Sequence, residues 1–244
     1  MFSSFRFAFF PLAFTVFVLG CATTAPQTTE TAVETAPAET KAPTAEAEKP
    51  PAPASVNMLF EEIPFRPFNP KKPNGIHVYA IKGNPNAGPF TAIVRFPAGF
   101  MMPLHSHDFA YDGLALSDGL VHGLSDADVH EVPKGSYWRQ PAKEAHTDGC
   151  KSDTFCYFLV TFEGPVNLVM EKEAVSESKG SMTKPADIAW KEMRGGVKMA
   201  TIRGDHTKGA FLALIDFPAG MATNVHTHSH DFAGLVLSGK HHRG

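Results

Sequence analysis

The feature that most constrains this chain is an internal repeat with an offset of 121 residues. Residues 81–99 read IKGNPNAGPFTAIVRFPAG and residues 202–220 read IRGDHTKGAFLALIDFPAG, so the two segments align without a gap. Farther along, GLALS at 113–117 matches GLVLS at 234–238 at the same offset. So many matches in one register predict two copies of one domain rather than a single large unit.

The two copies differ in extent. The first has room to span residues 56–180, whereas the second, at 190–244, stops in the first half of its own pattern. We therefore expect one full domain followed by an incomplete copy. Two explanations stay open at this point, a truncated sequence and a degenerate C-terminal copy.

The first copy has the sequence pattern of strands and turns. Runs rich in β-branched and aromatic residues occur at 90–96, 113–121 and 157–162, and clusters of Gly, Pro and Asp bound them. Sustained helical periodicity is scarce beyond residue 55, and the chain contains 20 Gly and 20 Pro. This pattern predicts an all-β fold, either a barrel or a jelly roll.

Residues 1–20 have the features of an export signal. Arg6 precedes an apolar run at 7–19, whose length suits a signal peptide better than a membrane span. The run ends in VLGC, which resembles the bacterial lipoprotein signal motif. The resemblance implies cleavage before Cys21 and lipid attachment to it, and Ala22 after the cysteine implies an outer-membrane lipoprotein on the periplasmic side of the envelope. The alternative is an ordinary signal peptide with an incidental cysteine.

The segment at 21–55 is composed almost entirely of Ala, Thr, Pro, Glu and Lys. Its only β-branched aliphatic residue is Val33, so it cannot bury enough surface to offset the entropy of ordering. We expect a disordered tether that holds the folded part away from the membrane. The net charge of −3 and the lack of a basic run after residue 20 argue against a nucleic-acid partner.

The stretch GFMMPLHSHDFAYDG, which begins at Gly99, carries the most informative polar residues. His105 and His107 are two residues apart, so in a strand their side chains project from the same face. Asp112 can return to the same space if the chain turns, and His146 supplies a third imidazole. These residue types predict one site for a divalent metal such as Fe, Zn, Mn or Ni.

These stretches resemble the two motifs of the cupin superfamily. The first motif is Gly, five residues, His-x-His, three or four residues, Glu, six residues, Gly, and the second is Gly, five residues, Pro-x-Gly, two residues, His. The corresponding positions here are Gly99, His105, His107, Asp112 and Gly119, then Gly135, Pro141 and His146. The resemblance implies a small β-barrel, or jelly roll, in which His105, His107, Asp112 and His146 hold the metal. Within the superfamily, the tandem copies look most like the bacterial DUF4437 or ChrR-like cupins.

Two positions depart from the cupin pattern. Asp112 stands in place of Glu and is one methylene shorter, so we expect it to ligate the ion weakly, or only through water, which would leave a three-histidine site. Lys143 stands where a turn glycine is usual. We expect this lysine to alter the loop without moving His146.

The second copy repeats the histidine pair but not the whole site. His226 and His228 match the first pair at the offset of 121 residues, and Ala233 occupies the acid position. The counterpart of His146 would fall beyond Gly244. The string HSHDFA at 105–110 and 228–233 also allows a local slide of two residues. We treat His226 and His228 as a candidate second site that cannot close within this sequence.

Several other residues leave alternatives open. Cys150 and Cys156 flank a short turn and are either a hairpin disulfide or two buried thiols. Arg139 or Gln140 is a candidate to contact a substrate anion from the strand before His146. Four further histidines are expected to be solvated: His122, His130, His241 and His242.

Three hypotheses about function fit this sequence. The first is a metal-dependent enzyme acting on a small organic molecule, with dioxygenation as the leading hypothesis and isomerisation or hydrolysis next; Asp112 would ligate or act as a base. The second is a non-catalytic metal or small-ligand sensor, or a structural zinc domain. A scaffold without metal is a third reading. The resemblance to cupins also implies a homodimer.

Overall fold

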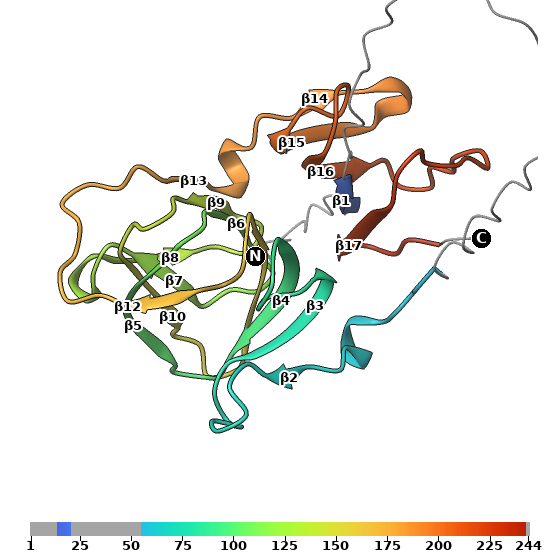
Figure 1. The fold of residues 1–244 in the computed structure, drawn as a ribbon. Helices are drawn as coiled ribbons and strands as arrows, with labels where there is room; N and C mark the ends of the chain where they lie inside the picture. The colour runs from blue at the N-terminus through green and yellow to red at the C-terminus, as the bar shows by residue number, and fades with distance from the viewer. Residues whose placement is uncertain (1–13, 21–54, 243–244) are drawn as a thin grey trace, which may run out of the picture. The chain divides into compact units, whose positions relative to one another are not determined.

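The computed structural model describes residues 14–20 and 55–242, and most of its regular structure is β-strand (Figure 1). Of the described residues, 14–20 and 64–242 belong to one compact unit, and 55–63 belong to a second. The described part of the second unit contains a 3-10 turn, η1 (Phe60–Glu62). Among the described residues, no helix has the length and apolar character needed to cross a membrane.

The first copy consists of two antiparallel sheets. One sheet has the strand order β12-β5-β10-β7-β8 and the other has the order β13-β9-β6-β11-β4-β3-β2. The strands of the first sheet are β5 (Met101–His107), β7 (Leu120–Gly123), β8 (Val129–Val132), β10 (His146–Cys150) and β12 (Leu168–Met170). The strands of the second sheet are β2 (Arg66–Pro67), β3 (His77–Gly83), β4 (Phe90–Phe96), β6 (Tyr111–Ala115), β9 (Tyr137–Gln140), β11 (Cys156–Phe162) and β13 (Ser181–Thr183).

The two sheets enclose one apolar core. Alternate residues of β4, from Phe90 to Phe96, point into it, as strand geometry requires. They meet Leu120 and Val132 from the opposite sheet, and Phe90 stacks on Phe162 with ring centroids 4.9 Å apart. Two antiparallel sheets closed around one core are the arrangement expected of a jelly roll. The predicted all-β cupin fold is therefore confirmed.

The second copy repeats the strand pattern of the first. Its sheet has the order β14-β15-β16-β1-β17, and the strands are β1 (Phe14–Gly20), β14 (Lys191–Glu192), β15 (Lys198–Gly204), β16 (Phe211–Phe217) and β17 (Phe232–Ser238). Both β15 and β16 lie 121 residues after β3 and β4. The register shift between Ala80 and Lys82 recurs between Thr201 and Arg203. The sequence repeat therefore corresponds to a repeat of strand pairing, and the register shift is repeated with it.

Strand β1 takes the place in the second copy that β11 holds in the first. It pairs with β16 on one side and β17 on the other, as β11 pairs with β4 and β6. Residues 1–13 and 21–54 lie outside the described residues, and Cys21 lies among them. The signal peptide, the tether and the domain boundaries stay predictions.

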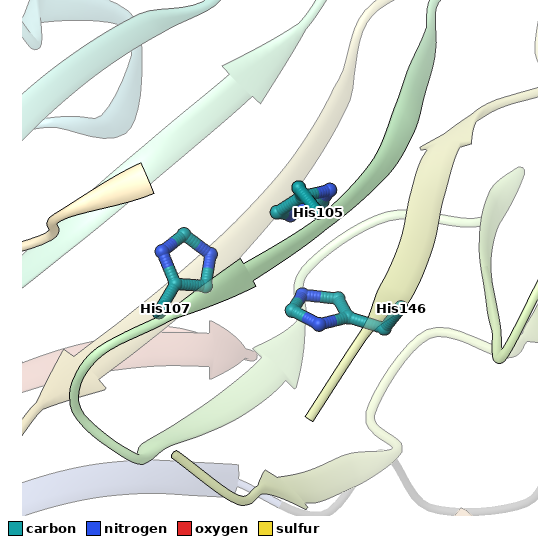
Figure 2. A group of neighbouring side chains, drawn as sticks. All are labelled: His105, His107 and His146. Carbon is teal, nitrogen blue, oxygen red and sulfur yellow. The ribbon is translucent and has the colours of Figure 1, made fainter. Parts of the chain in front are cut away.

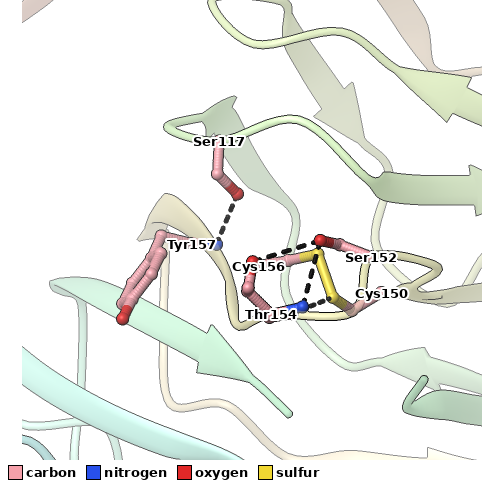
Figure 3. The surroundings of a disulfide bond; sticks show 6 residues. All are labelled: Ser117, Cys150, Ser152, Thr154, Cys156 and Tyr157. Atoms are coloured by element: carbon pink, nitrogen blue, oxygen red, sulfur yellow. Dashed lines mark hydrogen bonds between the residues drawn. A yellow bond between two sulfur atoms is a disulfide. The ribbon is translucent and has the colours of Figure 1, made fainter. Parts of the chain in front are cut away.

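A disulfide joins the two sheets of the first copy (Figure 3). Cys150 ends β10 and Cys156 begins β11, and their Cα atoms are 5.6 Å apart. Both residues are fully buried. Of the two readings that the sequence left open, the structure has the disulfide, which ties the end of β10 to the opposite sheet.

We expect loss of this disulfide to destabilise the domain. Replacing both Cys150 and Cys156 by Ser should lower the free energy of unfolding by about 2 kcal/mol, because a short cross-link restricts the unfolded chain. Urea unfolding followed by tryptophan fluorescence measures the change. Wild-type protein in reductant should lose a similar amount, while the double variant should not respond to reductant. Equal urea midpoints for the variant and the oxidised wild type would contradict the expectation.

Candidate metal centre

Three histidines from two adjacent strands meet inside the first copy (Figure 2). His105 and His107 lie on β5 and His146 begins β10, where it pairs directly with His105. One ring nitrogen from each lies within 4.8 Å of the others. All three side chains are buried, with at most 7% of their surface exposed. This cluster can hold a metal ion.

Backbone carbonyls orient all three rings. The Nδ1 atom of His105 is 2.8 Å from the oxygen of Pro103, and that of His107 is 2.6 Å from the oxygen of Val166. His146 Nδ1 is 3.0 Å from the oxygen of Glu144. A carbonyl oxygen can only accept, so each Nδ1 carries the proton and each Nε2 presents a lone pair. Protein metal sites commonly fix imidazole ligands in this way.

The buried setting also keeps these imidazoles neutral. Burial lowers the pKa of His105, His107 and His146 below the usual value for histidine. The neighbouring imidazoles lower the pKa of His146 further. A metal ion binds the neutral ring, so protons compete weakly for the three Nε2 atoms near neutral pH.

Asp112 does not join the three imidazoles. Its Oδ2 lies 2.8 Å from Nε of Arg203 and 3.3 Å from Nη1 of Arg139, and Glu163 contacts both guanidinium groups. Burial raises the pKa of Asp112, and the two arginines lower it again in part. Asp112, which we expected to be a metal ligand, is therefore one of the carboxylates in an ion-pair cluster with two arginines. Arg139 belongs to the same cluster, so its charge is directed to these carboxylates.

Tyr111 occupies the position beside the imidazoles that we expected for an acid. Successive side chains of β6 point to opposite faces, so Tyr111 faces inward where Asp112 faces outward. Its hydroxyl oxygen lies 3.3 Å from Nε2 of His146, and its ring stacks on Phe162. Tyr111 is 2% exposed, and burial raises its pKa, so the phenol keeps its proton and can donate to the imidazole.

Sequence reasoning missed the carboxylate that does approach the imidazoles. Oδ2 of Asp148, on β10, is 3.8 Å from Nε2 of His105 and 3.9 Å from Nε2 of His146. Asp148 follows His146 by two residues, and the alternation of side chains along a strand was the signal that pointed to it. Burial raises the pKa of this carboxyl group.

His122 also belongs to this region, so the expectation that it is solvated was wrong. Its ring centroid is 5.2 Å from that of His146. His122, Trp138 and Asp148 contribute to the wall of a cavity of about 10 Å³. Nδ1 of His122 and Oδ1 of Asp148 are buried without a hydrogen-bond partner among the described residues. A cavity of this size has room for about one water molecule.

A second layer of polar residues supports His146 and His122. Gln140 lies 3.1 Å from Nε2 of His122 through its side-chain oxygen and donates its amide to the backbone oxygen of Glu144. Gln140 therefore supports the site from behind. Lys143, the departure from the turn glycine, has a φ of 60°. It adopts the left-handed conformation that favours glycine, and its N–H donates to the backbone oxygen of His107.

The histidine pair of the second copy lies in a different setting. The ring centroids of His226 and His228 are 5.0 Å apart, but both side chains are exposed. Their segment contains no strand among the residues that the structure describes, unlike β5 in the first copy. Among the described residues, only the three histidines of the first copy bring three potential ligand atoms within 4.8 Å of one another. The second site stays a prediction.

Comparison with known families gives one match that covers most of the chain. The sequence model of the family described as "Domain of unknown function (DUF4437)" matches residues 81–244, which include parts of both copies. A curated relative, the DNA damage-repair/toleration protein DRT102 of Arabidopsis thaliana, is 29% identical over 92 residues. That alignment covers 37% of this chain and 29% of the relative, so the chain matches less than a third of its length.

Solved structures of low sequence identity are also similar. An RmlC-like cupin protein from Ralstonia eutropha JMP134 is 18% identical with a TM-score of 0.40, covering 52% of this chain and 80% of that one. The oxalate decarboxylase of Lactobacillus farciminis is 13% identical with a TM-score of 0.41, covering 61% of this chain and 60% of that one.

The ion pairs of Asp112 predict a role in stability rather than in metal binding. Replacing Asp112 by Asn should lower the free energy of unfolding by about 2 kcal/mol, because two guanidinium groups lose a buried partner. Glu163→Gln is the matched control, since it removes the more exposed carboxylate of the same cluster and should cost less than about 1 kcal/mol. Urea unfolding compares the three proteins. Equal stability of Asp112→Asn and wild type would show that the cluster contributes nothing.

Proposed function

We propose that this chain, which belongs to the DUF4437 family, binds one divalent metal ion through His105, His107 and His146 and acts as a metal-dependent enzyme. The observation that carries the proposal is the convergence of three buried imidazoles, with one ring nitrogen of each within 4.8 Å of the others and each Nδ1 held by a backbone carbonyl. A merely structural role for three buried imidazoles does not need all three to present the same nitrogen to one point.

The donor set favours an open site. Three imidazoles, with or without one carboxylate, leave positions free on an octahedral ion, whereas a tetrahedral structural zinc site is closed by its four protein ligands. A bound divalent ion supplies Lewis acidity or, if it is iron, redox chemistry. Dioxygenation of a small organic molecule is the first reaction that we propose, followed by isomerisation or hydrolysis. The neutral phenol of Tyr111 would hold a proton beside the substrate, and the apolar core around it would exclude water.

The metal-binding part of this proposal predicts a specific loss of metal. The protein purified with Fe, Zn and Mn available should hold about one ion per chain, and His105→Ala should lose it, because each structural imidazole ligand contributes strongly to affinity. Elemental analysis beside protein concentration gives the ratio. His130→Ala is the matched control, since His130 is an exposed imidazole on β8 and should leave the metal content unchanged.

The same measurement can overturn the proposal. If the wild type holds no more metal than His105→Ala, the site is not a metal centre. A Tm that rises with added metal in the wild type and in His130→Ala, but not in His105→Ala, would give independent support.

We also propose that the protein is a lipoprotein of the cell envelope, on the periplasmic side of the outer membrane. The signal-like segment that ends at Cys21 supports this location, as does the disulfide between Cys150 and Cys156, because disulfides persist in oxidising compartments. An acylated Cys21 and the Pro-rich segment that follows would tether the folded domain to the membrane.

Loss of the lipid attachment site should release the protein. In fractionated bacterial cells, the wild type should sediment with membranes and Cys21→Ser should not, because the anchor needs the sulfur atom. Cys150→Ser removes a different cysteine and should remain in the membrane fraction. Sedimentation of Cys21→Ser with the membranes to the same extent as the wild type would argue against a lipid anchor.

A further inference from the structure

Strand β10 brings a carboxylate to the three-histidine cluster that the cupin motifs do not include. We propose that Asp148, rather than Asp112, is the carboxylate ligand of the metal ion at this site. The inference rests on the proposed metal binding and adds a fourth ligand to it. It is carried by the position, contacts and surroundings of the Asp148 side chain.

The position of Asp148 on β10 directs it toward the cluster. It follows His146 by two residues, and the register of the pairing with β5 shifts between the two. Oδ2 of Asp148 still lies within 3.9 Å of Nε2 of both His105 and His146, so the side chain faces the cluster. In the pairing of β10 with β5, His146 lies opposite His105 and Asp148 lies opposite Met102. The carboxylate therefore approaches the ion position from the side of His105 and His146.

The distances allow a shared ion. Two donor atoms that each lie about 2.1 Å from one metal ion are at most about 4.2 Å apart. Oδ2 of Asp148 is 3.8 Å from Nε2 of His105 and 3.9 Å from Nε2 of His146. These separations allow an ion shared with His105 and His146, and they are too long for hydrogen bonds. Asp148 lies outside the set of three imidazoles whose ligand atoms are all within 4.8 Å of one another, so its side chain would move toward His107 to complete the ligand set.

The charges favour the same assignment. Three neutral imidazoles bring no negative charge to a buried divalent cation, and an uncompensated buried charge is costly. Asp112 cannot supply that charge, because Arg203 and Arg139 already neutralise it. Among the described residues, Asp148 is the one carboxylate recorded within 4 Å of a nitrogen of the cluster.

The surroundings of Oδ1, the other carboxylate oxygen of Asp148, also support its assignment as a ligand. Oδ1 is buried and has no hydrogen-bond partner among the described residues, and His122 presents an unpartnered Nδ1 to the same region. Both residues line the cavity that has room for about one water. One water can donate to Oδ1 and to Nδ1 at once, because Nε2 of His122 faces the oxygen of Gln140 and carries the proton. Oδ2 is then left for the cation.

The test compares the two candidate carboxylates in the full-length protein. Cobalt(II) affinity is measured by competition with a chelator for wild type, Asp148→Asn, Asp112→Asn and His105→Ala. We expect Asp148→Asn to bind at least about 10-fold more weakly than wild type and Asp112→Asn to bind equally well. The visible absorption of bound cobalt should change in Asp148→Asn and not in Asp112→Asn.

A second pair of variants reports ligation directly. In Asp148→Cys, a thiolate that coordinates cobalt(II) should produce a near-ultraviolet charge-transfer band, and Asp112→Cys should not. The charge-transfer band tests whether Asp148 ligates the metal even if Asp148→Asn fails to fold.

Two outcomes separate the two proposals. Wild-type affinity and spectrum in Asp148→Asn, with binding lost in His105→Ala, would overturn the role of Asp148 and leave the metal centre intact. If wild type binds no more cobalt than His105→Ala, the metal centre itself fails.

Discussion

The pairing of β5 with β10 is the constraint on which the rest of the site depends. It sets His105 opposite His146, so two segments far apart in the sequence supply neighbouring ligands. A slip of one residue would turn His146 to the other face of the sheet. The register shifts between His146 and Asp148, where Thr147 donates its hydroxyl to the oxygen of Met102, and the disulfide of Cys150 fastens the end of the strand. The stability of the fold and the geometry of the ligands thus rest on the same strand pair.

Strand alternation then determines which polar side chains enter the barrel. The histidine pair at 105 and 107 could be predicted because both residues lie within one strand, where a spacing of two means a shared face. Asp112 lies beyond a turn, and the number of residues in that turn sets its direction. The cupin pattern allows three or four residues there, and the structure follows the count that brings Tyr111 inward. The spacing of the motif alone could not decide whether Tyr111 or Asp112 points inward.

The repeat made the fold more predictable than the site. An offset of 121 residues carries β3 and β4 onto β15 and β16 together with their shared register shift, because a bulge depends on local backbone preferences that both copies keep. His122 was misjudged for a different reason. Its strand, β7, has no motif of its own, and its ring is enclosed by residues such as Trp138 that only tertiary packing brings near. The disulfide likewise depends on how β10 and β11 approach, which the sequence could not settle.

Charge balance distinguishes Asp112, which is buried, from Asp148, which is partly buried. On the outer face of β6, two arginines oppose Asp112 and Glu163, so that cluster is neutral within itself. Asp148 has no such partner in the described part of the chain and faces imidazoles that burial keeps uncharged. A carboxylate in this position must either keep its proton, as the raised pKa of Asp148 indicates, or meet a cation. The three imidazoles direct lone pairs at the same space and could bind that cation. The negative charge of Asp148 would destabilise the barrel without an ion, but it would increase the affinity of the site for a divalent ion.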